Sequence, residues 1–276
     1  MSIDFQPISS LCGVEVRGLD PRQPVTNTTR DLVTNAFNEY HLVLIRGYEL
    51  TEDQQVSFTQ ILGPLTNQGD TMSGRRSMFI SNAHADGALP DGEIFFHNDH
   101  AFFEFPKKAI GLHALAAPSK GGETLFGNIA RAYANLPDAL KQRIADLKAL
   151  HVKDYGVNRG DVQARDLPPN PSVPQAVHPV VKMHPITKEP LLFVSRLLTH
   201  SIVGIPERES EALLDELLPY TEDPATQYAH QWKVGDYIVW DNLYLQHART
   251  VFDPSEKRVL RHVPISGGDV KEPALV

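Results

Sequence analysis

Short apolar segments separated by turn residues dominate the C-terminal half of this chain. They occupy residues 179–183, 191–194, 228–233, 237–240 and 259–265. Each segment has the length and turn-bounded composition of a strand and is too short for an ordinary helix. Because these segments do not alternate with helices, a parallel βαβ sheet is disfavoured. The pattern predicts a mainly β fold with flanking helices, built as an antiparallel barrel or a double-sheet jelly roll.

Helical patterns are few and lie around these segments. They cover residues 29–40, 51–62, 129–136, 137–147 and 206–218. The second opens on Thr51 and Gln54, whose spacing predicts a capping box, and it ends before Gly63-Pro64. Further strands are expected at residues 13–16, 42–47 and 78–80, and in the short apolar runs between residues 94 and 126.

A chain of 276 residues, 41% of them hydrophobic, is long enough to bury a sizeable core. All-β architectures of this length commonly form one domain, so residues 1–276 are expected to form a single domain. One stretch interrupts the pattern. Residues 156–177 contain Pro168, Pro169, Pro171 and Pro174 and are predicted to form an irregular excursion, a candidate lid.

Charge and hydropathy exclude several classes of partner. The 26 basic and 34 acidic residues give a net charge of −8, and no dense basic run could follow a phosphate backbone, so nucleic acid is not an expected partner. No apolar stretch is long enough to cross a membrane, and the N-terminus lacks the layout of a signal peptide. The single cysteine, Cys12, fits a reducing compartment. We therefore expect a cytoplasmic protein.

Two fragments far apart in the chain carry metal-binding chemistry. His97-Asn98-Asp99 lies near residue 100, and His247 follows the run Trp240-Asp241-Asn242. Two imidazoles and one carboxylate bind a non-haem Fe(II) on one face and leave the opposite positions open. If His97 and Asp99 share a strand, their side chains point to the same face. The tripeptide also occurs by chance, and the chain has twelve histidines.

Two further residues fit an anionic co-substrate. Thr124 follows the turn at Gly121-Gly122 and places a hydroxyl on a predicted strand, and Arg258 comes eleven residues after His247. A guanidinium holds a carboxylate through two parallel hydrogen bonds, which lysine cannot do. Besides an oxygenase, these residues leave open a Zn or Mn enzyme such as a hydrolase or isomerase, and a non-catalytic binding protein.

The ordered set of motifs resembles the taurine and phenoxyacetate dioxygenases, the TauD/TfdA-like family of Fe(II)/2-oxoglutarate-dependent enzymes. The resemblance runs from residues 13–20 through 44–47, 62–65 and 178–181 to 240–242. It implies a double-stranded β-helix (jelly roll) core. The spacings from His97 to Thr124 and from His247 to Arg258 are close to those of the family.

Carried over position by position, the resemblance implies that His97, Asp99 and His247 bind Fe(II). Thr124 and Arg258 would hold the distal carboxylate of 2-oxoglutarate, with O2 as the second co-substrate. The implied reaction hydroxylates or oxidatively cleaves a small-molecule substrate and gives succinate and CO2. Asp99 favours oxygenation, because halogenases of this superfamily carry a small residue at its position. A homo-oligomer remains open.

The substrate side departs from the family pattern. Where the taurine and phenoxyacetate enzymes carry an arginine for an anionic group, this chain has His262, and Arg261 beside it faces the other side of a strand. Glu93 and Leu198 fall at substrate-facing positions, with Arg196 nearby. An acid at residue 93 would repel a sulfonate or carboxylate. These residues predict a neutral, cationic or zwitterionic substrate.

Overall fold

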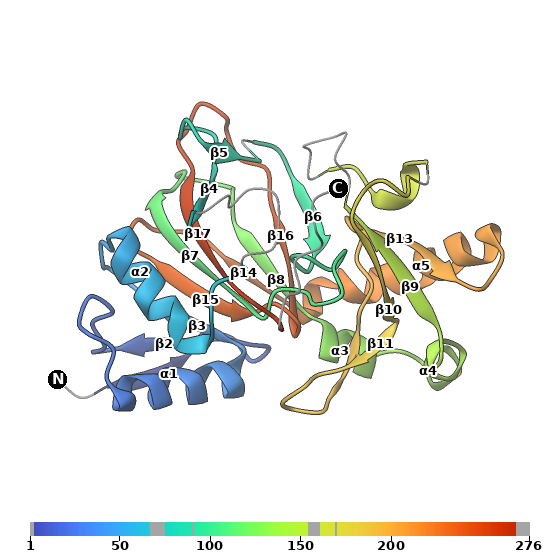
Figure 1. The fold of residues 1–276 in the computed structure, drawn as a ribbon, viewed down its shortest axis with the longest axis horizontal. Coiled ribbons are helices and arrows are strands. Elements are labelled where there is room, and N and C mark those ends of the chain that lie inside the picture. The colour runs from blue at the N-terminus through green and yellow to red at the C-terminus, as the bar shows by residue number, and fades with distance from the viewer. Residues whose placement is uncertain (1–2, 67–74, 90, 154–160, 169, 269–276) are drawn as a thin grey trace.

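The computed structural model describes residues 3–66, 75–89, 91–153, 161–168 and 170–268, and two facing β-sheets form its centre (Figure 1). The major sheet has the order β1 (Asp4–Pro7), β2 (Val14–Arg17), β3 (Leu42–Ile45), β15 (Tyr237–Asp241), β7 (Ala109–Ala116), β17 (Val259–Ile265), β4 (Met78–Ser81), β5 (Gly87–Ala88). The minor sheet has the order β14 (Gln227–His230), β8 (Thr124–Asn128), β16 (Leu245–Arg249), β6 (Ile94–His97). This pair of sheets is the predicted jelly-roll arrangement.

Alternating side chains of the major sheet build a core on each of its faces. In β3, Leu42 and Leu44 pack between the two sheets, whereas Val43 and Ile45 pack on the opposite side. That opposite side is covered by two helices, α1 (Asn27–Tyr40) and α2 (Glu52–Thr59). Since both faces of β3 are buried, its sequence is continuously apolar.

A third layer lies at the far end of the molecule. Its elements are the sheet β10 (Gln175–Pro179), β9 (Lys148–Val152), β13 (Thr199–Val203), the hairpin β11 (Val181–Met183), β12 (Pro190–Leu192), and the helices α3 (Ile129–Ala134), α4 (Asp138–Ile144), α5 (Glu207–Thr221). They enclose a separate apolar cluster that includes Ile144, Leu213 and Leu217.

Several boundaries differ from the sequence-based expectations. The first helix begins at Asn27 because Thr26 caps it, accepting a hydrogen bond from the backbone of Thr29. The capping box of Thr51 and Gln54 is confirmed. Residues 175–177, predicted as part of the irregular excursion, begin strand β10. Residues 156–160 and 169 lie outside the described residues, so the lid stays a prediction.

Two pairings in the major sheet are parallel, β2 with β3 and β4 with β5, while its other pairings are antiparallel. Among the described residues, no helix combines the length and apolar character needed to cross a membrane.

Candidate active site

Three predicted metal ligands meet at one end of the minor sheet. His97 is the last residue of β6, and the sheet register places it directly opposite His247 on β16. Directly opposed residues of antiparallel strands project to the same face. The Nε2 atom of His97 lies 3.3 Å from Oδ1 of Asp99, and that of His247 lies 3.8 Å from the same oxygen. One ligand atom from each of the three residues lies within 4.8 Å of the others.

Asp99 is not on the strand, contrary to the expected arrangement. Strand β6 ends at His97, and the backbone of Asp99 is instead bound by the side chain of Asn242. Asn242 Oδ1 accepts from the Asp99 backbone nitrogen at 2.8 Å, and its Nδ2 donates to the backbone oxygens of Asp99 and Lys107 at 3.0 and 2.9 Å. The turn between β15 and β16 therefore positions the carboxylate.

Replacing Asn242 by aspartate is expected to loosen the metal site. An aspartate keeps the oxygen acceptor, but its second oxygen would repel the two carbonyls that Nδ2 now binds. We expect the free energy of unfolding to fall by about 1–3 kcal/mol and the Mn(II) affinity to fall by ~10–100-fold. Urea denaturation and Mn(II) titration measure both. The exposed Asn35→Asp change is the matched control, and undiminished metal affinity in Asn242→Asp would contradict this role.

Hydrogen bonding and charge prepare the three residues for a cation. His97 Nδ1 donates to the backbone oxygen of Phe95 at 2.8 Å, which orients the ring with Nε2 toward Asp99 Oδ1. Burial alone would raise the pKa of Asp99, but the charge of Lys107 and the hydrogen bond from His262 hold that pKa well below its ordinary value. Burial lowers the pKa of His247 and keeps its imidazole neutral. An ionised carboxylate and neutral imidazoles are the forms that bind metal.

Thr124 and Arg258, the two predicted co-substrate residues, lie side by side. Thr124 begins β8, two residues before Phe126, which pairs with His247, so Thr124 faces the same side of the minor sheet. Arg258 Nη2 lies 3.4 Å from Thr124 Oγ1, and Arg258 Nε donates to the backbone oxygen of Gly122 at 3.0 Å. Both side chains are buried.

The Arg258 guanidinium fits a bound carboxylate. Only 2% of the residue is exposed, its Nη1 has no hydrogen-bond partner, and among the described residues no acid forms an ion pair with it. Burial, together with the charge of Arg249, lowers the pKa of Arg258. A buried, unpaired cation is costly unless a ligand compensates it. Trp232 Nε1 donates to Thr124 Oγ1 at 2.9 Å, which leaves the threonine proton for another acceptor.

The four residues predicted on the substrate side are placed differently from one another. His262 is buried and its Nε2 lies 3.2 Å from Asp99 Oδ2, so it contacts a metal-ligand candidate. Arg196 forms an ion pair with Glu222. Leu198 is buried in the core between the sheets, in the same cluster as Phe102. Glu93 is exposed just before β6.

Two residues of the site were missed by sequence analysis. Lys107 binds Asp99 through its ammonium, yet a lysine after a proline in a loop gives no local signal of such a contact. Asn242 stands in a motif that supported the resemblance, Trp240-Asp241-Asn242, but its partner lies 143 residues away. Only the folded chain shows these roles.

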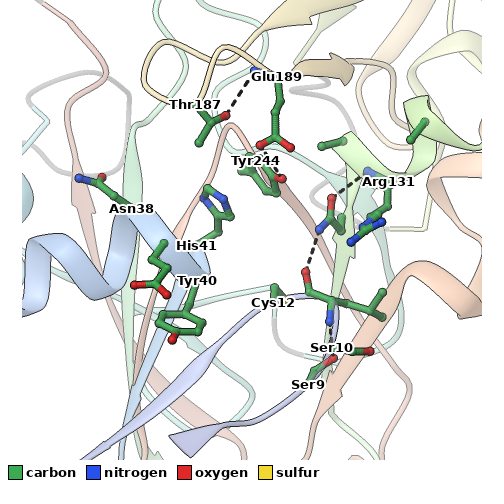
Figure 2. Close-up of a pocket in the computed structure, with 15 residues that line it drawn as sticks. Ser9, Ser10, Cys12, Asn38, Tyr40, His41, Arg131, Thr187, Glu189 and Tyr244 are labelled. Carbon is green, nitrogen blue, oxygen red and sulfur yellow. Dashed lines mark hydrogen bonds between the residues drawn. The ribbon is translucent and has the colours of Figure 1, made fainter. Parts of the chain in front are cut away.

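A separate cavity of about 550 Å³ lies beside the end of α1 (Figure 2). Its wall includes the stacked rings of His41 and Tyr244, whose centroids are 3.4 Å apart, and Glu189, which accepts a hydrogen bond from the Tyr244 hydroxyl. None of the predicted metal or co-substrate ligands lines this cavity. The cavity is therefore separate from the cluster of His97, Asp99 and His247.

Known proteins resemble the chain over nearly its whole length. Residues 4–263 match the family described as taurine catabolism dioxygenase TauD, TfdA family. An (S)-phenoxypropionate/alpha-ketoglutarate-dioxygenase from Sphingobium herbicidovorans is 30% identical over an alignment that covers 99% of this chain and 98% of the relative. An alpha-ketoglutarate-dependent 2,4-dichlorophenoxyacetate dioxygenase from Cupriavidus pinatubonensis is 28% identical, and the alignment covers 95% of this chain and 96% of the relative.

Solved structures agree with this relationship and confirm the jelly-roll fold. A taurine dioxygenase from Burkholderia xenovorans superposes with a TM-score of 0.79 at 27% identity, covering 97% of this chain and 92% of that one. A protein named AAD-2, solved with Mn(II) and N-oxalylglycine, gives 0.81 at 25% identity with both chains fully covered. The chain belongs to the TauD/TfdA family of Fe(II)- and 2-oxoglutarate-dependent dioxygenases.

Proposed function

We propose that His97, Asp99 and His247 bind Fe(II) in this dioxygenase, and that Thr124 and Arg258 bind the distal carboxylate of 2-oxoglutarate. The observation that carries this assignment is the buried Arg258 guanidinium, whose Nη1 has no hydrogen-bond partner among the described residues. It contacts Thr124 on the same side of the minor sheet as the converging Nε2 and Oδ1 atoms. With Fe(II) bound, one oxygen atom of O2 enters succinate as 2-oxoglutarate loses CO2, and the other oxidises the substrate.

The chain's own groups bind and orient the reactants. Because Thr124 Oγ1 accepts from Trp232, its hydroxyl proton points to the co-substrate carboxylate, which Arg258 Nη1 also faces. The buried walls of the site exclude water from the reacting atoms. An arginine and a threonine placed for a co-substrate disfavour a non-catalytic binding protein. The family match disfavours a hydrolase or isomerase.

For the substrate we propose a small neutral, cationic or zwitterionic molecule that contacts Glu93, Leu198, Arg196 and His262. Glu222 compensates the charge of Arg196, and His262 is held by Asp99. Neither residue therefore offers a free cation to an anion. The proposed substrate class differs from the anionic aryloxy acids, phenoxypropionate and 2,4-dichlorophenoxyacetate, for which the relatives are named.

A substrate screen tests both the dioxygenase reaction and the proposed class of substrate. Succinate formation from 2-oxoglutarate with Fe(II) and O2 is measured against amines, amino acids, sulfonates, sulfate esters and aryloxy acids. We expect turnover above the uncoupled background with an uncharged or amine-bearing compound. Turnover confined to sulfonates or aryloxy acids would overturn the proposed substrate class but would still be dioxygenase activity.

We also propose that the enzyme is cytoplasmic and forms a single domain. Light scattering would measure whether it forms a homo-oligomer.

A further inference from the structure

The two oxygens of the Asp99 carboxylate face different surroundings. Oδ1 faces the Nε2 atoms of His97 and His247. Oδ2 faces two donors on the other side: Lys107 Nζ at 3.1 Å and His262 Nε2 at 3.2 Å. A free carboxylate can bind a metal through one oxygen or both, and these contacts distinguish its two oxygens.

Lys107 is held in place by its backbone as well as its ammonium. The backbone nitrogen of Lys107 donates to the backbone oxygen of Asp99 at 3.3 Å, and the backbone oxygen of Lys107 accepts from Asn242 Nδ2. Only 6% of Lys107 and 4% of His262 is exposed. His262 reaches Asp99 from β17 in the major sheet, so the carboxylate is bound from the sheet opposite the imidazoles.

Resting on the proposed function, we propose that Lys107 and His262 are positioning residues that keep Asp99 a one-oxygen metal ligand. While Oδ2 is bound to the two donors, only Oδ1 can reach the metal. The coordination position that Oδ2 would otherwise occupy stays open for 2-oxoglutarate or O2. Neither residue needs to touch the substrate for this role.

The proposal predicts opposite effects on two binding steps. Without the Lys107 ammonium, Oδ2 is free to join the metal, and a cation that repels the metal ion is gone. Metal affinity should therefore hold or rise. Chelation by 2-oxoglutarate should weaken, because a coordination position is lost and because the dianion loses a nearby positive charge. Simple damage to the fold would weaken both steps together.

The decisive experiment compares Lys107→Met with Lys107→Arg and with the matched control Lys108→Met. Lys108 is the adjacent lysine, and its ammonium donates to the backbone oxygen of Leu62 instead of Asp99. Mn(II) binding is followed by tryptophan fluorescence, since the Trp240 ring centroid lies 4.9 Å from that of His247. Binding of 2-oxoglutarate to the anaerobic Fe(II) protein is followed by its visible charge-transfer band.

We expect Lys107→Met to retain or increase Mn(II) affinity and to weaken 2-oxoglutarate binding by ~10-fold or more, because a nearby positive charge is lost. Lys107→Arg should restore 2-oxoglutarate binding, and Lys108→Met should match the wild type. A parallel loss of both affinities overturns the proposal, as does unchanged 2-oxoglutarate binding. If Lys107→Met does not fold, His262→Leu is compared with His262→Gln, which keeps a donor. A wild-type protein that binds no Mn(II) would instead contradict the proposed function.

Discussion

His97→Ala should abolish Fe(II)-dependent decarboxylation of 2-oxoglutarate. The change removes one of three ligand atoms that lie within 4.8 Å of one another, and Asp99 and His247 alone cannot hold the ion on one face. Removing a residue that hydrogen-bonds to a metal ligand typically lowers metal affinity or activity by ~10–100-fold, and removing the ligand itself should lower both by more. Succinate formation and Mn(II) titration measure the catalytic and binding losses separately.

A second histidine provides the control for this experiment. His200 is half-buried on β13, and its Nδ1 lies 3.2 Å from the hydroxyl oxygen of the neighbouring Ser201. His200→Ala should retain both Mn(II) binding and succinate formation. If His97→Ala remained active after chelation and readdition of Fe(II), the metal assignment would be wrong. If both variants lost activity together with their thermal transition, the effect would lie in folding.

The fold was readable where the local pattern was strong. Strand β17 has the predicted bounds 259–265, and the capping box at Thr51 starts the second helix as expected. Strand β16 was missed because residues 245–249 mix apolar with polar and charged side chains. Gln246 and Arg249 are buried despite their polarity, and tertiary contacts override the local signal there.

The site was readable as residue types but not as geometry. The pairing of His97 with His247 depends on a register between strands about 150 residues apart, which no local pattern specifies. The placement of Asp99 depends on Asn242, and its second oxygen depends on Lys107 and His262. The residue types therefore point to the three residues that converge, whereas the contacts that Asn242, Lys107 and His262 make with Asp99 have no local signal.

Arg258→Met should separate co-substrate binding from metal binding. The buried guanidinium has an unpartnered Nη1 and is the group that we assign to the distal carboxylate. Loss of one partner from a buried charge pair costs about 2–5 kcal/mol, so the affinity for 2-oxoglutarate should fall by roughly 30-fold or more. Mn(II) affinity should stay at the wild-type level, because Arg258 forms no hydrogen bond to the three metal ligands. Titration of the anaerobic Fe(II) protein, followed by its charge-transfer band, measures the affinity for 2-oxoglutarate.

The free energy of unfolding of ligand-free Arg258→Met distinguishes a role in co-substrate binding from a role in the fold. Methionine removes a buried cation that no acid compensates among the described residues, and it also removes the hydrogen bond to Gly122. These effects oppose each other, so the free energy of unfolding should change by less than about 1 kcal/mol. Arg258→Lys keeps the charge but not the paired donors, and its affinity should lie between those of Arg258→Met and the wild type. A large loss of stability in Arg258→Met with unchanged 2-oxoglutarate affinity would mean that the guanidinium serves the fold, and the co-substrate carboxylate would then need another partner.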